Sequence, residues 1–302
     1  MFLIADSGST KTAWCLIEDP EHVIYTQGIN PFQQNEEEIR VILQHELLPN
    51  LISQASSLTP SLSAIHFYGA GCTPEKAPIV AEALRQVFSS ATDIHVESDM
   101  LGAARGLCGH QAGIVSILGT GSNSCYYDGC SLHPGIPALG YILGDEGSGA
   151  YMGKRLVGDV LKRQFPEDVC QLFFQETQET QADIIQRVYR TPLPNRYLAS
   201  LSPFCARHRE HPAIHAFLID CFTQFFQRNI IPLSRELKKA NPRLLTPDSS
   251  LPAPDSLLTT VHFVGSVAHY YRTELTEAAT SLGYSVGTIL QAPLQGLVSY
   301  HR

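Results

Sequence analysis

The chain opens with an apolar run, a short polar segment and a second apolar run. Residues 2–5 are apolar, residues 6–12 are mostly small and polar, and residues 14–17 are again apolar. This pattern is typical of a buried strand, a tight turn and a second strand. Similar apolar runs predict further strands at residues 23–28, 64–69, 93–98, 114–118, 125–127 and 260–264.

Between these strands, apolar residues recur with the spacing of amphipathic helices. In residues 36–48, Ile39, Leu43 and Leu47 share one helical face, and acidic residues occupy the first turn, where the helix dipole favours them. Strands that alternate with helices indicate an α/β fold. The other predicted helices are at residues 75–88, 101–107, 150–163, 182–190, 215–240 and 293–300, and a surface loop is predicted at 242–256.

The pattern restarts in the second half of the chain. A unit of strand, polar turn and strand occurs at Asp6 and again at Gly119, which indicates a weak repeat of architecture. A chain of 302 residues is long enough for two domains. Because glycines cluster at positions 106, 109 and 113, we expect one domain at 1–108 and another at 109–302. The final helix, about residues 291–302, is a candidate to pack back on the first domain.

Composition narrows the classes of function. The formal net charge of −8 argues against nucleic acid or an anionic membrane as the main partner. No apolar run approaches the ~20 residues that a membrane span needs, and no secretion signal is visible at the N-terminus. The eight cysteines lie at irregular spacings, as expected for reduced thiols in a cytoplasmic protein.

Glycine-rich turns follow three of the predicted strands, at residues 8–11, 119–122 and 265–266. Ligands bind at strand ends of this kind in open α/β sheets. In the first turn Gly8 lets the backbone approach a ligand, Lys11 supplies a cation, and Asp6 is placed to hold a metal ion or its waters. These groups favour a phosphate-binding turn, and an ordinary polar hairpin is the alternative.

Acidic residues at two positions are candidates for catalysis or binding. Asp99 ends a predicted strand and precedes a helix of small residues, so it could accept a proton from a substrate hydroxyl or simply cap the helix. Asp145 and Glu146 lie in a glycine-rich loop, where they could bind a substrate or remain a solvated acidic loop.

Three histidines, His208, His211 and His215, invite comparison with a zinc site. Pro212 interrupts a helix among them, and neither a cysteine pair nor a His-Glu-x-x-His motif accompanies them. Surface histidines at the start of a helix are the better interpretation.

Taken together, these motifs give the chain a family resemblance. It resembles the BadF/BadG/BcrA/BcrD-type ATPase family, in the superfamily of sugar kinases, hsp70 and actin, and within it the N-acetylglucosamine kinases. The resemblance implies two ribonuclease-H-like domains with an ATP cleft between them. The motifs that carry it are Asp-Ser-Gly-Ser-Thr-Lys-Thr at 6–12, Gly-Ile-Asn-Pro at 28–31, Ser-Asp at 98–99, Gly-Thr-Gly-Ser-Asn at 119–123 and Gly-Asp-Glu-Gly-Ser at 144–148.

The resemblance also implies a role for each motif residue. Asp6 would hold Mg²⁺, through water, and Asp99 would be the general base that deprotonates a sugar hydroxyl. The sugar would be contacted by Asn30, Gly71, Asp99 and Asp145. The ATP phosphates would be contacted by Gly8, Ser9, Thr10, Lys11, Thr120, Gly121 and Ser122, and the adenosine by Gly265 and Ser266.

The function implied is ATP-dependent phosphorylation of an amino sugar, most simply N-acetylglucosamine, by a cytoplasmic enzyme that could be a homodimer. Two alternatives stay open. One is an ATPase activator of a dehydratase or reductase, with an iron–sulfur cluster, and the other is a sugar-sensing protein without catalysis. The chain departs from the superfamily pattern at Ser266, where a second glycine is usual. A Cβ at this position could narrow the adenine slot.

Overall fold

The computed structural model describes residues 1–8, 10–55, 62–133, 135–240 and 258–302. The chain divides into two compact units. Unit 1 comprises Met1–Gln111, Tyr127–Leu132 and Ala292–Arg302, and unit 2 comprises Ala112–Tyr126 and His133–Gln291. The predicted surface loop at 242–256 and the phosphate candidate Ser9 lie outside the described residues.

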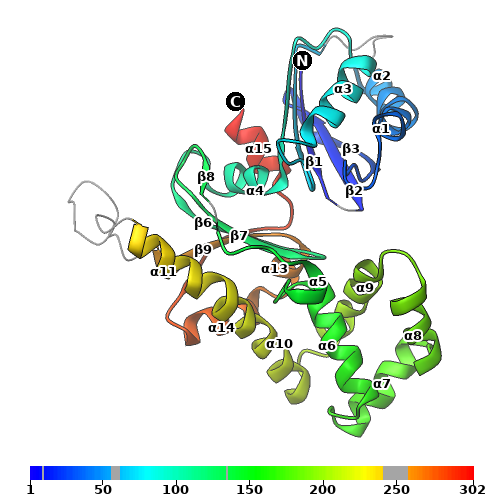
Figure 1. Cartoon of the computed structure of the whole chain (residues 1–302), viewed down its shortest axis with the longest axis vertical. Helices are drawn as coiled ribbons and strands as arrows, with labels where there is room; N and C mark the ends of the chain where they lie inside the picture. Colours follow the sequence, from blue (N-terminus) through cyan, green and yellow to red (C-terminus); the bar gives the residue numbers. More distant parts are fainter. Residues whose placement is uncertain (9, 56–61, 134, 241–257) are drawn as a thin grey trace. The chain divides into compact units, whose positions relative to one another are not determined.

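Unit 1 contains a five-stranded sheet with the order β3-β2-β1-β4-β5 (Figure 1). Strand β2 is antiparallel to β1 and to β3, whereas β4 is parallel to β1 and to β5. The strands are β1 Phe2–Ser7, β2 Lys11–Leu16, β3 Asp19–Gln27, β4 Ala64–Gly69 and β5 Asp93–Ser98. The helices are α1 Glu36–Ile42, the π-helix η1 Leu43–Leu47, α2 Leu48–Ala55, α3 Ala77–Val87, α4 Asp99–Cys108 and α15 Leu294–Tyr300.

Alternating residues of β1 pack in two hydrophobic cores, one on each face of the sheet. Leu3 and Ala5 pack with Trp14 and with residues of α1–α3, whereas Ile4 packs on the opposite face with residues of α15. Because successive side chains of a strand point to opposite faces, one apolar run supports both layers.

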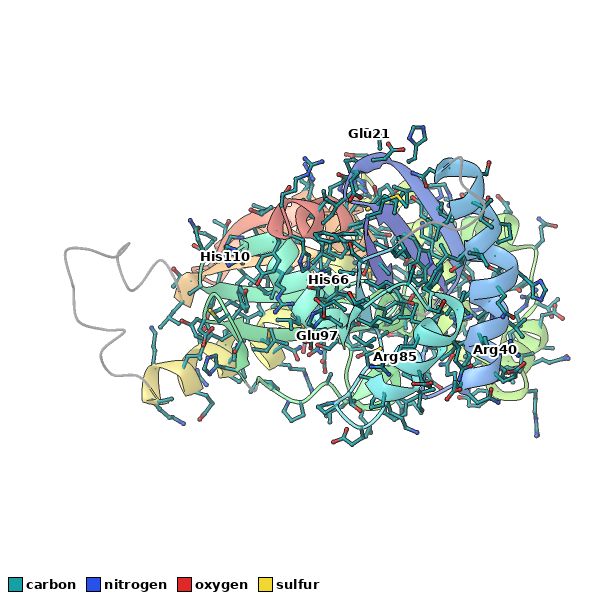
Figure 2. All side chains as sticks on the ribbon, turned by 90° about the horizontal axis from the view of Figure 1, so that it is seen from above. Glu21, Arg40, His66, Arg85, Glu97 and His110 are labelled. Carbon is teal, nitrogen blue, oxygen red and sulfur yellow. The ribbon has the colours of Figure 1, made fainter. Side chains whose placement is uncertain are left out.

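The last helix, α15, packs closely against α4 within unit 1. A Cβ at Gly296 would lie only 2.0 Å from the carbonyl oxygen of Gly106, so glycine at 296 allows the two helices to approach. His66 and Glu97 lie on the neighbouring strands β4 and β5 (Figure 2), and the ring of His301 stacks on that of His66 with a centroid distance of 4.0 Å.

Unit 2 has a five-stranded sheet with the order β10-β9-β6-β7-β8. The strands of this sheet are β6 Gly113–Leu118, β7 Ser122–Tyr127, β8 Leu132–His133, β9 Thr260–Val264 and β10 Ser285–Leu290, and only the adjoining ends of β7 and β8, Tyr127 and Leu132, are counted with unit 1. Its helices are α5 Gly140–Leu143, α6 Gly149–Leu161, α7 Glu167–Thr177, α8 Gln181–Arg190, α9 Pro194–Arg207, α10 Pro212–Phe225, the π-helix η2 Phe226–Ile230, α11 Ile231–Ala240, α13 Ser266–Tyr270 and α14 Arg272–Ser281. A large hydrophobic core in this unit includes Met152, Phe222 and Phe263.

The two sheets repeat one arrangement. Strands β6 to β10, in chain order, take the same relative places in the second sheet as β1 to β5 take in the first. In both sheets the first and fourth strands are parallel neighbours, as are the fourth and fifth. The predicted α/β fold with two ribonuclease-H-like domains is confirmed, and the weak repeat seen in the sequence is the second copy of this sheet.

Several helices and two strands were not predicted from the sequence. The additional elements are helices α2, α5, α7 and α9 and strands β8 and β10, and α9 contains Pro203 in its interior. The predicted helix at 215–240 begins at Pro212 and continues through η2 into α11. Within the described ranges, none of the helices combines the length and the apolar character that crossing a bilayer requires.

Candidate active site

Two carboxylates, Asp6 and Asp99, are electrostatic neighbours in unit 1. Asp6 lies near the end of β1, and Asp99 is the first residue of α4, directly after β5. Burial and the charge of Asp99 raise the pKa of Asp6, the charge of Lys11 opposes the rise, and the net result is a pKa of about 7. Burial also raises the pKa of Asp99. The carboxyl ends of strands from one sheet thus bring together acids 93 residues apart in the sequence.

Asp99 is not the cap of its helix. Ser98 is the N-cap of α4, and its hydroxyl accepts a hydrogen bond from the Leu101 amide at 3.2 Å. One oxygen of Asp99, Oδ1, accepts a hydrogen bond from the Met100 amide at 2.8 Å, and this bond lowers the pKa that burial raises. Because Ser98 satisfies the helix end, the capping interpretation of Asp99 is wrong.

The turn between β1 and β2 is held by backbone and hydroxyl groups. The Gly8 amide donates to the Lys11 carbonyl at 3.1 Å, and Gly8, Thr10 and Lys11 are exposed. Thr12, the last residue of the 6–12 motif, is buried, and its hydroxyl lies 2.7 Å from that of Ser7. Thr12 therefore ties the two strands together instead of facing a ligand.

The segment that carries Asn30 packs directly on this turn. A Cβ at Gly28 would lie 2.6 Å from the Gly8 carbonyl oxygen, so only glycine fits there. Asn30 Oδ1 accepts a hydrogen bond from the Phe32 amide at 3.0 Å. A Cβ at Gly71, whose φ is +80°, would lie 2.4 Å from the same Oδ1. The structure thus brings Asn30 and Gly71 together, and Gly71 leaves room for the Asn30 side chain.

In unit 2, the glycine turn between β6 and β7 is fastened to the start of α6. The amides of Gly149 and Ala150 donate to the carbonyls of Gly119 and Thr120 at 2.8 and 3.0 Å. The Gly119 amide donates to the Gly121 carbonyl at 3.0 Å, and Ser122 is buried. The turn is therefore a rigid feature of unit 2, with its backbone shaped before any ligand binds.

Asp145 lies against this turn. A Cβ at Gly121 would lie 2.9 Å from Asp145 Oδ2, so the glycine makes space for the carboxylate. Burial raises the pKa of Asp145, a hydrogen bond from the Ser122 amide and the charge of Lys154 lower it, and the charge of Glu146 raises it. The backbone of Asp145 is left-handed, with φ at 58°, and such strain is common at binding sites.

The third glycine turn joins β9 to α13. Gly265 has φ of +124°, and a Cβ on it would lie 2.2 Å from the Leu118 carbonyl oxygen. Ser266, the first residue of α13, is exposed. Gly265 therefore cannot be replaced without a shift of β6, whereas the side chain of Ser266 is accommodated at the surface of unit 2.

Other polar residues have clear structural partners. The ring nitrogens of His208, His211 and His215 pair with three different acids, Glu176, Asp168 and Glu277. Among the described residues, no group of three or more His, Cys, Asp or Glu side chains is arranged to hold a metal ion.

Glu146 is a residue whose setting the sequence did not reveal. It is 7% exposed and lies 3.6 Å from Arg228 Nη1 and 3.4 Å from Asn229 Nδ2. Both partners come from η2, more than 80 residues along the chain, so only the fold shows that this loop residue is buried.

Comparison with solved structures places the fold among sugar kinases. Neither a protein-family model nor a curated protein sequence matches the chain. A putative N-acetylglucosamine kinase from Chromobacterium violaceum superposes with a TM-score of 0.68 at 17% identity, over 100% of this chain and 98% of that one. A ROK family glucokinase from Streptomyces griseus, in complex with glucose and AMPPNP, gives 0.54 at 12% identity, over 99% and 97%. These two likenesses concern the fold alone.

A third structure is much closer in sequence. The putative N-acetylglucosamine kinase from Porphyromonas gingivalis is 46% identical to this chain, with a TM-score of 0.86, over 100% of this chain and 98% of that one. The chain therefore belongs to the same family of sugar kinases as the Porphyromonas protein.

Proposed function

We propose that the chain is an ATP-dependent kinase that transfers a phosphoryl group to a hydroxyl of an amino sugar, with N-acetylglucosamine as the first candidate. The observation that carries the proposal is the pair of Asp6 and Asp99 in unit 1. One carboxylate lies beside a phosphate-type turn, and the other is its partly buried electrostatic neighbour, within a chain of the sugar kinase family.

In this proposal Asp99 is the general base. Its pKa is raised by burial, which makes its carboxylate a stronger base than that of an ordinary aspartate. Asn30 and Asp145 bind sugar hydroxyls, and Gly71 supports Asn30. Phosphoryl transfer needs little covalent work from the protein, so accurate placement of the hydroxyl and charge stabilisation supply most of the catalysis.

The residues of unit 1 suit a magnesium ion. Asp6 offers a carboxylate at a strand end beside the 8–11 turn, and Mg²⁺ is commonly held by one or two carboxylates with waters and substrate phosphates. Asp6 would hold the ion through water. When bound, the ion neutralises charge on the phosphates of ATP.

The remaining candidates would bind the nucleotide. Gly8, Thr10 and Lys11 in unit 1, and Thr120, Gly121 and Ser122 in unit 2, are proposed to contact the phosphates, as is Ser9. The hydrogen bonds that hold the 119–122 turn to α6 support this role, because they fix the backbone that would approach the phosphates. Gly265 and Ser266 are proposed to lie beside the adenosine.

A sugar panel tests the function. Purified protein is assayed for ADP release with ATP and Mg²⁺ in the presence of N-acetylglucosamine, N-acetylmannosamine, glucosamine or glucose, and the product is identified by mass spectrometry. We expect fast, sugar-dependent ADP release with an amino sugar, and release slower by about 10²–10⁴-fold with Asp99→Asn. Absence of a phosphorylated sugar across the panel would contradict the proposal.

A further inference from the structure

Lys11 is held by an aromatic ring. Its ammonium nitrogen lies 4.5 Å from the ring centroid of Tyr25, within the distance at which a cation is attracted to the face of an aromatic ring. Among the residues that the structure describes, Lys11 forms no ion pair, although its charge acts on Asp6. The Tyr25 ring is therefore the group that restrains the cation of the 8–11 turn.

The pairing of β2 with β3 brings these two side chains together. Lys11 is opposite Gln27, and Ala13 is opposite Tyr25, so Lys11 and Tyr25 are diagonal neighbours on one face of the sheet. Side chains in this relation lie within reach of each other when they are long or aromatic. The contact thus follows from the strand register and is built into unit 1.

Packing in the hydrophobic core does not explain why a tyrosine is present at position 25. Its neighbour Ile24 packs on the core around Trp14, and Thr26 accepts a hydrogen bond from the Trp14 indole at 3.0 Å. Tyr25 points to the opposite face, where it remains 58% exposed although Val23, two residues earlier, packs beside α15 residues. An exposed tyrosine that is not required for packing is free to serve a neighbouring side chain.

Restraint of Lys11 matters because a free lysine has many rotamers. A flexible four-carbon side chain loses this freedom when it binds an anion, which weakens binding. A ring that already restrains the ammonium reduces the loss, and the charge of Asp6 favours a cation in the same region.

We propose that Tyr25 is a positioning residue that holds Lys11 ready for the phosphates of ATP. The inference rests on the proposed function, since it assigns a helper to a residue of the same phosphate site. The proposal predicts that loss of the Tyr25 ring weakens nucleotide binding and changes neither sugar binding nor the rate of the chemical step.

The test compares Tyr25→Leu with Tyr25→Phe. Removal of the ring should raise KM for MgATP about two- to five-fold, the size of an exposed cation–π contact, while kcat and KM for the sugar stay unchanged. Tyr25→Phe keeps the ring face and should behave as wild type. Tyr189→Leu on α8, which removes a tyrosine that is 76% exposed, is the matched control and should change none of the three constants.

A double-mutant cycle distinguishes positioning of Lys11 from a general effect of Tyr25. In a Lys11→Met background, Tyr25→Leu should cause no further rise in KM for MgATP. The proposal is overturned if Tyr25→Leu leaves this KM unchanged, if Tyr25→Phe is as impaired as Tyr25→Leu, or if the two effects simply add.

Calorimetric titration with ADP and Mg²⁺ separates this proposal from the proposed function. If no sugar is phosphorylated but the nucleotide binds, a weaker affinity of Tyr25→Leu than of wild type for ADP would still support the role of Tyr25. An equal affinity would contradict it. A wild-type protein that binds no nucleotide would contradict both.

Discussion

The two glycine turns at 8–11 and 119–122 occupy equivalent places in two similar sheets, yet their surroundings differ. The turn in unit 1 lies beside Asp6, whose pKa is raised by burial and by Asp99. The turn in unit 2 is bonded to the start of α6, and its Ser122 amide donates to the carboxylate of Asp145. In both places a neighbouring acid raises the pKa and a lysine lowers it, but a backbone amide, that of Ser122, lowers the pKa of Asp145 and, among the described residues, none acts on Asp6.

This difference suggests that the two copies of the fold have different roles, one in the chemical step and the other in ligand positioning. Acids that repel each other in a buried place are costly to keep, and such costs are usually found where chemistry occurs. Asp145 is suited to binding, because the nearby Lys154 favours its charged form together with the Ser122 amide. We therefore propose that residues of unit 1 carry the chemical step and that the turn and Asp145 of unit 2 position the ligand.

The largest expected effect comes from Asp99→Asn. Asparagine keeps the shape of the side chain and can still accept the Met100 amide bond, but it cannot take a proton. Loss of a general base typically lowers kcat by about 10²–10⁴-fold, and we expect the dissociation constant for the sugar, measured by calorimetry, to stay within a few-fold of wild type. A variant that keeps more than half of the wild-type kcat would remove Asp99 from the role of base.

Gly121→Ala should disturb unit 2 in a different way. The new Cβ would lie 2.9 Å from Asp145 Oδ2, so the carboxylate must move. Because small displacements of a binding group can cost up to about 10²-fold, we expect a 10- to 100-fold loss of kcat/KM for the sugar. Gly158→Ala in α6 is the control, since a Cβ there meets no atom within 4 Å, and it should retain activity. Equal activity in the two variants would argue against a tight fit between Gly121 and Asp145.

The smallest effect is on stability and its pH dependence. The pKa of Asp6 is raised from 3.8 to about 7, so the folded protein binds this proton more tightly than the unfolded chain does. Protonation of Asp6 therefore contributes its full share to the free energy of unfolding below pH ~4, and this contribution is lost as the pH rises through ~7. Without Mg²⁺, Asp6→Asn should therefore exceed wild type in free energy of unfolding by about 1–2 kcal/mol at pH 8, a value reduced because the side chain is partly exposed.

The same pH series contains its own check. The gain of Asp6→Asn should shrink towards pH 4, where both forms of the protein carry a neutral side chain. Asp19→Asn is the control of opposite sign, because a hydrogen bond with His22 lowers the pKa of Asp19. It should show no gain at pH 8. A gain for Asp6→Asn that is constant with pH would mean that ionisation of Asp6 is not its cause.

The first turn illustrates how far the sequence alone could go. The apolar run before Asp6 and the polar turn after it predicted the β1–β2 hairpin, which the strand register confirms. The sequence could not separate Thr10, which is exposed, from Thr12, which is buried, because the alternation of faces depends on where β2 begins. It also left the role of Asp99 open, since Ser98 and Asp99 are equally good capping residues.

Other features depend on distant contacts and were invisible in the sequence. Strand β10 contains Gly287, which weakens a strand pattern, yet the ring of His262 fills the space where its Cβ would be. Helix α9 contains Pro203, which usually interrupts a helix. The contact of Gly121 with Asp145 joins two motifs that were recognised separately. For Gly287 and Gly121, a tertiary neighbour decides what the local pattern cannot.

The most direct test of the division of work is a side-by-side kinetic comparison of Asp145→Asn and Asp99→Asn with N-acetylglucosamine and MgATP. Loss of one hydrogen bond to a charged group should raise KM for the sugar about 10- to 100-fold in Asp145→Asn while kcat stays within a few-fold of wild type. Asp99→Asn should show the reverse, with kcat lost and KM kept. If Asp145→Asn loses kcat as severely as Asp99→Asn, with no change in KM, the assignment of chemistry to unit 1 and of positioning to unit 2 is contradicted.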